Sequence, residues 1–271
     1  MMEPKIIHKL DPVISEVKKK TGINIDNFKP TFLERRILFR MRTVGILDYD
    51  EYVKLLSTSF DEAKSLYTAF SINVTKFFRD PHVWEKLEND IIPNFLKTTR
   101  FSPIRAWSCG SASGEEPHSI SILLNDSLKE TRIGYQVYAT DISADAITHA
   151  KKGIYRNENL INVHPERLNT HFEKTSEGHY QVSSVIRNRI EYERLDMLKT
   201  TGKLFDIIFC RNVLIYYDKD AHEQIFKKFA DVLKKDGILV LGQDESMIGT
   251  KGCNYFELPC PKERIYQKKS Q

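Results

Sequence analysis

The sequence predicts an α/β protein in which a small N-terminal helical domain precedes a doubly wound, Rossmann-like domain that carries a small β-subdomain insertion. Helical periodicity runs through the first hundred or so residues, whereas short apolar runs alternate with helical segments in the remainder. A length of 271 residues also suits two domains better than one. We expect a helical domain with its linker helix over residues 1–97 and an α/β domain over 98–271, with the insertion at about 172–192.

The N-terminal part is predicted to be helical because its apolar residues recur at helical spacing. The segment TFLERRILFRMRTVG forms the clearest amphipathic helix, which Gly45 ends. DYDEYVKLL and DEAKSLYTAFSI predict two shorter helices, and a longer one opens with Asp80 as its cap and Pro81 at its first position. The apolar face of the first segment comprises Leu33, Ile37, Met41 and Val44.

Four apolar runs in the second part are of strand type, and helical segments follow the first three. This alternation predicts a parallel sheet covered by helices. Before the third run, EGHYQVSSVIRNRIEYERL alternates around a turn-like RN pair, so we expect a hairpin or small sheet inserted there. The four runs are IRAWSC (104–109), YQVYATD (135–141), FDIIFC (205–210) and GILVLG (237–242).

The composition is that of an ordinary globular protein, with 41% hydrophobic and 29% charged residues. A net charge of +4 is too mild to indicate a nucleic-acid partner. No apolar stretch has the character of a signal peptide or a membrane span, so we expect a cytoplasmic protein. The four cysteines stand singly and indicate no metal site. We expect a monomer.

Polar residues directly follow the predicted strands, at the edge where open α/β sheets bind ligands. Asp141 stands where a ribose-binding acid is expected, and an Asx cap of the helix starting at Ser143 explains it equally well. Asp196 could accept a hydrogen bond from an adenine amino group, although an exposed loop acid is the simpler interpretation. Arg211 and Asn212 follow a buried strand and need partners, either a ligand or the neighbouring backbone.

The loop SCGSASGEEPHS contains two glycines and two adjacent acids, Glu115 and Glu116. A phosphate is disfavoured beside two carboxylates, whereas a cationic ligand is favoured. S-adenosylmethionine, a nucleoside with a sulfonium, an ammonium and no phosphate, meets this requirement. A structural alternative is a capping box in which Ser113 and Glu116 cap the following helix.

Four motifs together resemble the CheR family of chemotaxis receptor methyltransferases, in the same order and at similar spacing. They are NVTKFFRDP, WSCGSASGEEPHSI, ATDISADAITHAKKGIY and FDIIFCRNVLIYYDKDAHEQIF. The resemblance implies transfer of a methyl group from S-adenosylmethionine to glutamate side chains on cytoplasmic receptor helices, leaving S-adenosylhomocysteine and methyl esters. It also implies recruitment to membrane receptor arrays, without insertion into the membrane.

The resemblance further implies roles for single residues. Arg79 would contact the cofactor and pair with the incoming carboxylate, unless it pairs with Asp80 or Glu85. Tyr216 would lie near the transferred methyl group, unless it packs in an aromatic core. The cofactor contacts implied are Asn73, Thr75 and Arg79 from the helical side, and Glu116, Asp141, Asp196, Met197, Arg211 and Asn212 from the α/β side.

A basic helix near the N-terminus bears on the substrate. The methylated receptor segments of this family are acidic helices, so a basic helix would steer and orient them. A solvated basic face is the ordinary alternative. Its arginines are Arg35, Arg36, Arg40 and Arg42.

The chain departs from the family pattern at two places. His118 replaces a tyrosine and is expected to be a surface or packing histidine, while Ser113 replaces a threonine and keeps a hydroxyl. The sequence GQDESM, with Gln243 and Asp244, stands where the family often has His-Ser-Glu. A cofactor-binding regulator without catalysis, a methyltransferase for another protein and a nicotinamide-dependent oxidoreductase are the alternatives.

Overall fold

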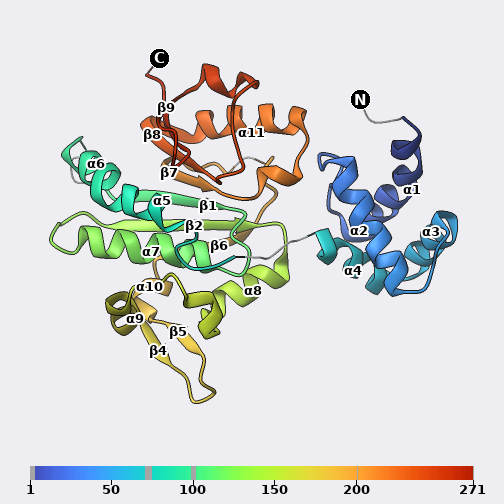
Figure 1. Cartoon of the computed structure of the whole chain (residues 1–271), viewed down its shortest axis with the longest axis horizontal. Coiled ribbons are helices and arrows are strands. Elements are labelled where there is room, and N and C mark those ends of the chain that lie inside the picture. Colours follow the sequence, from blue (N-terminus) through green and yellow to red (C-terminus); the bar gives the residue numbers. More distant parts are fainter. Residues whose placement is uncertain (1–3, 71–74, 99–101, 200, 271) are drawn as a thin grey trace. The chain divides into compact units, whose positions relative to one another are not determined.

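The computed structural model describes residues 4–70, 75–98, 102–199 and 201–270. By its contacts the chain divides into two units, one formed by Met1–Ile72 with Tyr216–His222 and the other by the remainder (Figure 1).

The first unit is a helical bundle. Apolar side chains such as Val13, Ile37 and Leu56 form its core and are inaccessible to solvent. The segment at Tyr216–His222 joins it through backbone hydrogen bonds from Lys29 N to Tyr216 O (2.9 Å) and from Asp218 N to Asn27 O (3.0 Å). The helices are α1 (Pro4–Thr21), α2 (Pro30–Thr43), α3 (Tyr49–Thr58) and α4 (Phe60–Phe70).

The second unit is built on a seven-stranded sheet in the order β6-β2-β1-β7-β8-β10-β9. The first five strands run parallel, and β10 and β9 add antiparallel hairpin partners at one edge. The predicted doubly wound sheet is thus confirmed, and three predicted runs coincide with strands. The strands are β1 (Ile104–Cys109), β2 (Tyr135–Asp141), β6 (Ile190–Arg194), β7 (Phe205–Cys210), β8 (Leu233–Leu241), β9 (Phe256–Cys260) and β10 (Ile265–Lys268).

Helices cover both faces of this sheet (Figure 1). Alternate residues of β1 show the two sides: Ala106 packs in the core cluster with Ile120 of α7, whereas Trp107 contacts Phe229 of α11. The helices are α5 (Pro81–Lys86), α6 (Ile92–Thr98), α7 (Glu115–Leu128), α8 (Ala144–Lys152), α9 (Pro165–His171), α10 (Ser184–Arg187) and α11 (Lys219–Val232), with short turns η1 (Leu87–Ile91), η2 (Asn157–Leu160), η3 (Leu214–Tyr216) and η4 (Lys251–Asn254).

The linker helix lies in the second unit and not in the helical domain expected to extend to residue 97. Phe77, Trp84 and Leu87 are buried in the core cluster that also contains Ile104 of β1. Residues 75–97 therefore belong by their packing to the α/β unit. Their apolar face matches the core of the sheet, which helical periodicity alone does not specify.

The inserted β-subdomain also differs from the expectation. Its small antiparallel sheet has the order β3-β5-β4 and comprises β3 (Ile154–Tyr155), β4 (Phe172–Lys174) and β5 (Tyr180–Val182). The predicted alternative of a small inserted sheet is thus confirmed. The hairpin around the RN pair is wrong, because Ser184–Arg187 is helical and β6 pairs in parallel with β2 of the main sheet. The insertion thus begins earlier and ends earlier than 172–192.

Candidate functional site

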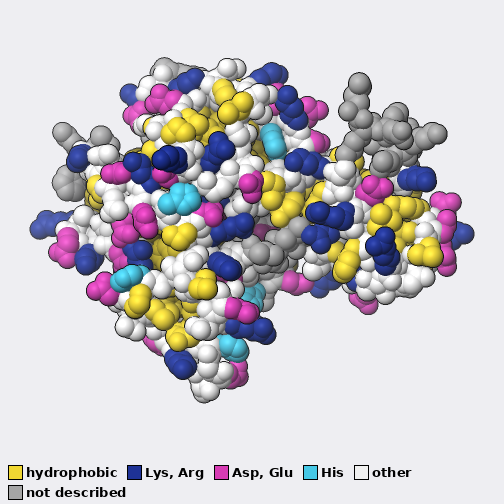
Figure 2. All heavy atoms as spheres, in the orientation of Figure 1, with side chains coloured by type: hydrophobic (Ala, Val, Ile, Leu, Met, Phe, Trp, Pro, Cys, Tyr) yellow, Lys and Arg dark blue, Asp and Glu magenta, His cyan; other side chains and the backbone are white. Residues whose placement is uncertain are grey.

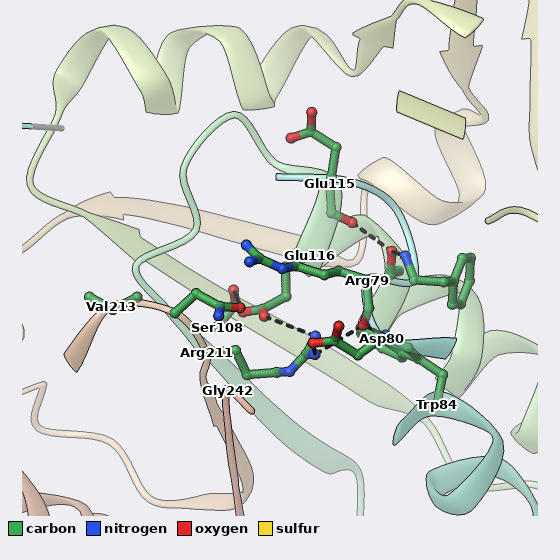
Figure 3. Close-up of polar contacts among 12 residues, drawn as sticks. Arg79, Asp80, Trp84, Ser108, Glu115, Glu116, Arg211, Val213 and Gly242 are labelled. Atoms are coloured by element: carbon green, nitrogen blue, oxygen red, sulfur yellow. Dashed lines mark hydrogen bonds and ion pairs between the residues drawn. The ribbon is translucent and has the colours of Figure 1, made fainter. Parts of the chain in front are cut away.

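The carboxyl ends of β1 and β7 bring together acids and arginines far apart in the sequence. Arg211 follows β7, and its side chain is only 2% exposed. Its Nη2 donates to Asp80 Oδ2 (2.7 Å), and its Nη1 lies 3.9 Å from Glu116 Oε2 (Figure 3). Glu116 and Arg211, both predicted to contact the cofactor, therefore meet at this edge of the sheet.

The segment carrying Arg79 is held in a strained conformation. Phe78 (φ 48°) and Asp80 (φ 57°), on either side of Arg79, both lie in the left-handed region, which is costly for residues with a side chain. The backbone carbonyl of Arg79 accepts from Arg211 Nη2 (2.9 Å) and Trp84 Nε1 (2.8 Å). In Figure 3 the Arg79 side chain extends across this cluster towards Glu116.

Asp80 does not cap α5 as expected. Its side chain makes no capping hydrogen bond to that helix, although Pro81 does occupy the first helical turn. The carboxylate instead pairs with Arg211, because a buried guanidinium needs a counter-charge.

Glu116 points into the cluster and does not form the capping box considered with Ser113. Gly114 is the residue that precedes α7, and it contributes no side-chain cap. Glu116 Oε1 accepts from Ser108 Oγ (2.8 Å). Burial raises the pKa of Glu116, and the positive charge of Arg211 opposes this rise.

Glu115 is more deeply buried than its neighbour, at 1% exposure. Its carboxylate accepts from Ser113 Oγ (2.7 Å) and from Asn159 Nδ2 (2.9 Å), and it points away from Arg211 (Figure 3). Burial raises its pKa to about 7. Glu115 is therefore held by two side-chain hydrogen bonds inside the fold.

Asp141 has the structural role that was one of its two interpretations. Its Oδ1 accepts from Ser143 N (2.8 Å), and Ser143 caps α8. Its Oδ2 accepts from Ala112 N (2.8 Å), so the same carboxylate also holds the loop after β1. Burial raises the pKa of Asp141. These contacts leave its ribose-binding role open, since a carboxylate can accept about four hydrogen bonds.

Asp196 and Met197 follow β6. Asp196 is half-buried, and its Oδ1 accepts from Leu198 N (2.9 Å) in a local turn. Met197 is buried, and its carbonyl accepts from Lys228 Nζ (2.6 Å). Lys228, which the sequence did not single out, thereby anchors this loop.

Asn212 adopts a positive φ of 61°, and its backbone N–H donates to Glu245 Oε2 (2.9 Å). Glu245 lies in the GQDESM segment but was not among the predicted site residues. The sequence offered one weak indication, an acid shortly after a glycine at the end of an apolar strand. Its burial, at 3% exposure, is visible only in the structure.

His118 is a fully buried packing histidine, so its surface interpretation is wrong. Its Nδ1 lies 2.8 Å from Gly114 O and 2.9 Å from the Tyr155 hydroxyl. Burial lowers its pKa to about 3, so the imidazole is neutral at physiological pH.

Tyr216 belongs by its contacts to the first unit, where its ring lies 4.8 Å from that of Phe32. The neighbouring Tyr217 stacks on Phe28 at 4.7 Å. Aromatic packing therefore accounts for part of this segment. Among the other predicted contacts, Thr75 is half-buried, and Asn73 lies outside the described residues.

The basic helix is α2, but its arginines are not equivalent. Arg40 donates through Nη2 to Glu62 Oε2 (2.6 Å) and through Nε to Oε1 (3.1 Å), and Tyr52 also donates to Glu62. Arg40 is therefore an internal ion-pair residue, contrary to the expectation. Arg35 and Arg42 are exposed, and Figure 2 shows Lys and Arg side chains over the area of α2.

The charges at the sheet edge suit a cation better than a phosphate. Arg211 contacts the carboxylates of Asp80 and Glu116, and Ser111 Oγ and Arg211 Nε are buried without a hydrogen-bond partner in the described part of the chain. A nucleoside with hydroxyls, a carboxylate and two positive charges fits this set. Within the described ranges, no three His, Cys, Asp or Glu side chains are arranged to hold a metal ion, and no helix has the length and apolar character of a membrane span.

Two family models match the chain: the SAM-binding domain of CheR methyltransferases over residues 73–258 and the all-alpha domain of the same family over residues 9–71. A chemotaxis protein methyltransferase of Borreliella burgdorferi is 31% identical over 91% of this chain and 91% of its own length. Enzymes of the same description from Escherichia coli (31%; 85% and 81% covered) and Listeria innocua (33%; 86% and 87% covered) are also similar. The chain belongs to the CheR methyltransferase family.

Proposed function

We propose that this S-adenosylmethionine-dependent methyltransferase methylates glutamate side chains on the cytoplasmic helices of chemotaxis receptors, giving methyl esters. The observation that carries the proposal is the buried cluster of Glu116, Arg211 and Asp80 beside Arg79, in a chain that matches the family over nearly its whole length. The names of the similar enzymes, chemotaxis protein methyltransferases, support a receptor substrate.

The cofactor is proposed to lie at the carboxyl ends of β2, β1 and β7. Bound S-adenosylmethionine supplies an electrophilic methyl group on a positively charged sulfur. Glu116 retains acceptor capacity towards its ammonium, and Asp141 towards its ribose. We assign the remaining cofactor contacts to Asn73, Thr75, Arg79, Asp196, Met197, Arg211 and Asn212.

Transfer to a carboxylate requires alignment more than proton transfer. A glutamate with a pKa near 4.3 is already ionised at neutral pH, so no general base is needed. Arg79 is proposed to orient the incoming carboxylate. Its backbone is held by two hydrogen bonds to its carbonyl, between neighbours Phe78 and Asp80 that both have positive φ. The Tyr216 hydroxyl is proposed to help define the methyl pocket.

The exposed arginines of α2 are proposed to bind the acidic receptor helices. Arg35 and Arg42 remain available for this role, whereas Arg36 is half-buried against the Phe32 ring and Arg40 pairs with Glu62. Reversing both exposed charges should raise the KM for receptor and leave the KM for the cofactor unchanged. Recruitment to receptor arrays would follow from this interaction, with the enzyme acting on the cytoplasmic side.

The test is a methylation assay with labelled S-adenosylmethionine and receptor-containing membranes. We expect base-labile label in the receptor, and a loss of about 100-fold or more in kcat/KM for Arg79→Ala. Lys76→Ala, which removes an exposed charge from the same segment, is the matched control and should change little. Binding of S-adenosylhomocysteine without any transfer would instead indicate a regulator, and label in another protein would indicate a different substrate.

A further inference from the structure

Glu245 accepts four backbone hydrogen bonds from the ends of two neighbouring strands. Gly242 N, after β8, donates to it at 2.6 Å. The other three donors are consecutive residues after β7: Asn212 N (2.9 Å), Val213 N (2.7 Å) and Leu214 N (2.7 Å). One carboxylate therefore ties together the two loops, one of which carries Arg211 and Asn212.

This carboxylate compensates for an unfavourable backbone conformation. Successive N–H groups that converge on one point form a site for an anion, and the left-handed conformation of Asn212 (φ 61°) helps to create that convergence. Without this acceptor, the N–H groups of residues 212–214 would lose their partner, which is costly where the residue is buried, as at Leu214. The conformation of this loop therefore depends on the Glu245 side chain.

Gly242 is packed closely against Glu245 and the loop after β7. A Cβ atom on Gly242 would lie 2.7 Å from Asn212 N and 2.7 Å from Glu245 Oε2. A Cβ atom on Gly110, after β1, would lie 2.6 Å from Val213 Cγ2, and Gly110 has a positive φ of 85°. The loop after β7 is thus in close contact with the loops after β1 and β8.

We infer that Glu245 is a positioning residue for cofactor binding, which holds the backbone of residues 212–214 so that Arg211 and Asn212 face the ligand. The inference rests on the cofactor roles proposed above for Arg211 and Asn212. A glutamine cannot replace this acid, because its amide NH₂ would face N–H donors where the carboxylate oxygens accept.

Calorimetry with S-adenosylhomocysteine, combined with hydrogen exchange of individual amides, tests this role. Glu245→Gln should weaken binding about tenfold or more and speed exchange at residues 212–214 by a similar factor. Asp244→Asn is the matched control, since it alters an exposed acid next in the chain, and should change either quantity less than about twofold. Gly242→Ala should reproduce the exchange pattern of Glu245→Gln, because its methyl group displaces the same atoms.

Glu245→Asp is the variant to measure if Glu245→Gln does not fold. It keeps the charge on a shorter side chain and should weaken binding less, with faster exchange at residues 212–214 and unchanged exchange in α7. Uniformly faster exchange, or S-adenosylhomocysteine binding within twofold of wild type in Glu245→Gln, would overturn the inference. If Asn212→Ala and Arg211→Ala also bind normally, the cofactor roles themselves fail, which separates the two conclusions.

Discussion

Glu116 and Glu245 lie at the same edge of one sheet, yet they are held in different ways. Glu116, after β1, has side-chain partners: a hydrogen bond from Ser108 and an ion pair with Arg211 at 3.9 Å. Glu245, after β8, has four backbone N–H partners. Burial raises the pKa of both acids, because removal from water disfavours the charged carboxylate.

The difference teaches which buried acid can bind a ligand. A carboxylate has about four acceptor positions, and backbone donors fill those of Glu245. Glu116 has one hydrogen bond, from Ser108, and one ion pair, with Arg211, so it keeps acceptor positions open. We therefore expect substitutions of Glu245 to disturb the conformation of the surrounding loops. Substitutions of Glu116 should lower the affinity for the ligand and leave these loops unchanged.

The largest effect is expected for Arg211→Ala, which removes the shared partner of Glu116 and Asp80. The partly exposed carboxylates of Glu116 and Asp80 would lose their buried counter-charge, so the free energy of unfolding should fall by about 3 kcal/mol. Urea denaturation measures this loss. Arg105→Ala, which removes an exposed arginine of β1, should cost less than about 0.5 kcal/mol; equal losses in the two variants would contradict the buried ion-pair network.

A smaller effect concerns the pH dependence of stability through Glu115. Its pKa is raised from 4.5 to about 7 on folding, so the folded state binds the proton more tightly than the unfolded state. The stabilisation is complete below about pH 4.5 and is lost as the pH rises to about 7, by at most about 3 kcal/mol. His118, whose pKa falls to about 3, acts in the opposite direction below pH 6.5.

The difference between wild type and Glu115→Gln isolates Glu115 from His118. We expect the wild type to lose unfolding free energy relative to the glutamine variant as the pH rises from about 4.5 to about 7. Chemical denaturation at a series of pH values measures it. A difference that is flat over this window would show that Glu115 is ionised throughout.

Glu116→Gln should separate binding from stability. The affinity for S-adenosylhomocysteine should fall about tenfold, because a neutral amide replaces the charge proposed to face the ligand's ammonium. The free energy of unfolding should change by less than about 1 kcal/mol, since removing a buried charge offsets the weaker contact with Arg211. Calorimetry and denaturation on the same preparation test both parts, and a parallel loss of stability would make Glu116 resemble Glu245.

Ser108→Ala should have a smaller effect than the roughly tenfold loss of affinity expected for Glu116→Gln. The Ser108 hydroxyl is fully buried and donates to Glu116, so its loss should cost about 1 kcal/mol of unfolding free energy. In a double-mutant cycle with Glu116→Ala the two losses should not add, because both substitutions remove the same hydrogen bond. Additive losses would mean that the contact is not energetically coupled.

The main sheet was predictable because strands buried on both faces are continuous apolar runs. IRAWSC, YQVYATD and FDIIFC coincide with β1, β2 and β7. The pairing of β6 was not predictable, because its alternating pattern suits a hairpin as well as the edge of a parallel sheet. Asp80 likewise looked like a cap, since Asp-Pro is a local pattern, whereas its partner Arg211 is 131 residues away.

By itself the sequence determined the class of the fold and the resemblance to the family, and it predicted that the cofactor contacts lie at the strand ends. These follow from apolar periodicity and from residue types, which act locally. Only the tertiary structure decided the different roles of the acids, since Glu115 and Glu245 are held by surrounding groups, while Glu116 is directed at Arg211. The physical reason is that burial and hydrogen-bond partners are set by segments distant in the chain, which no local pattern encodes.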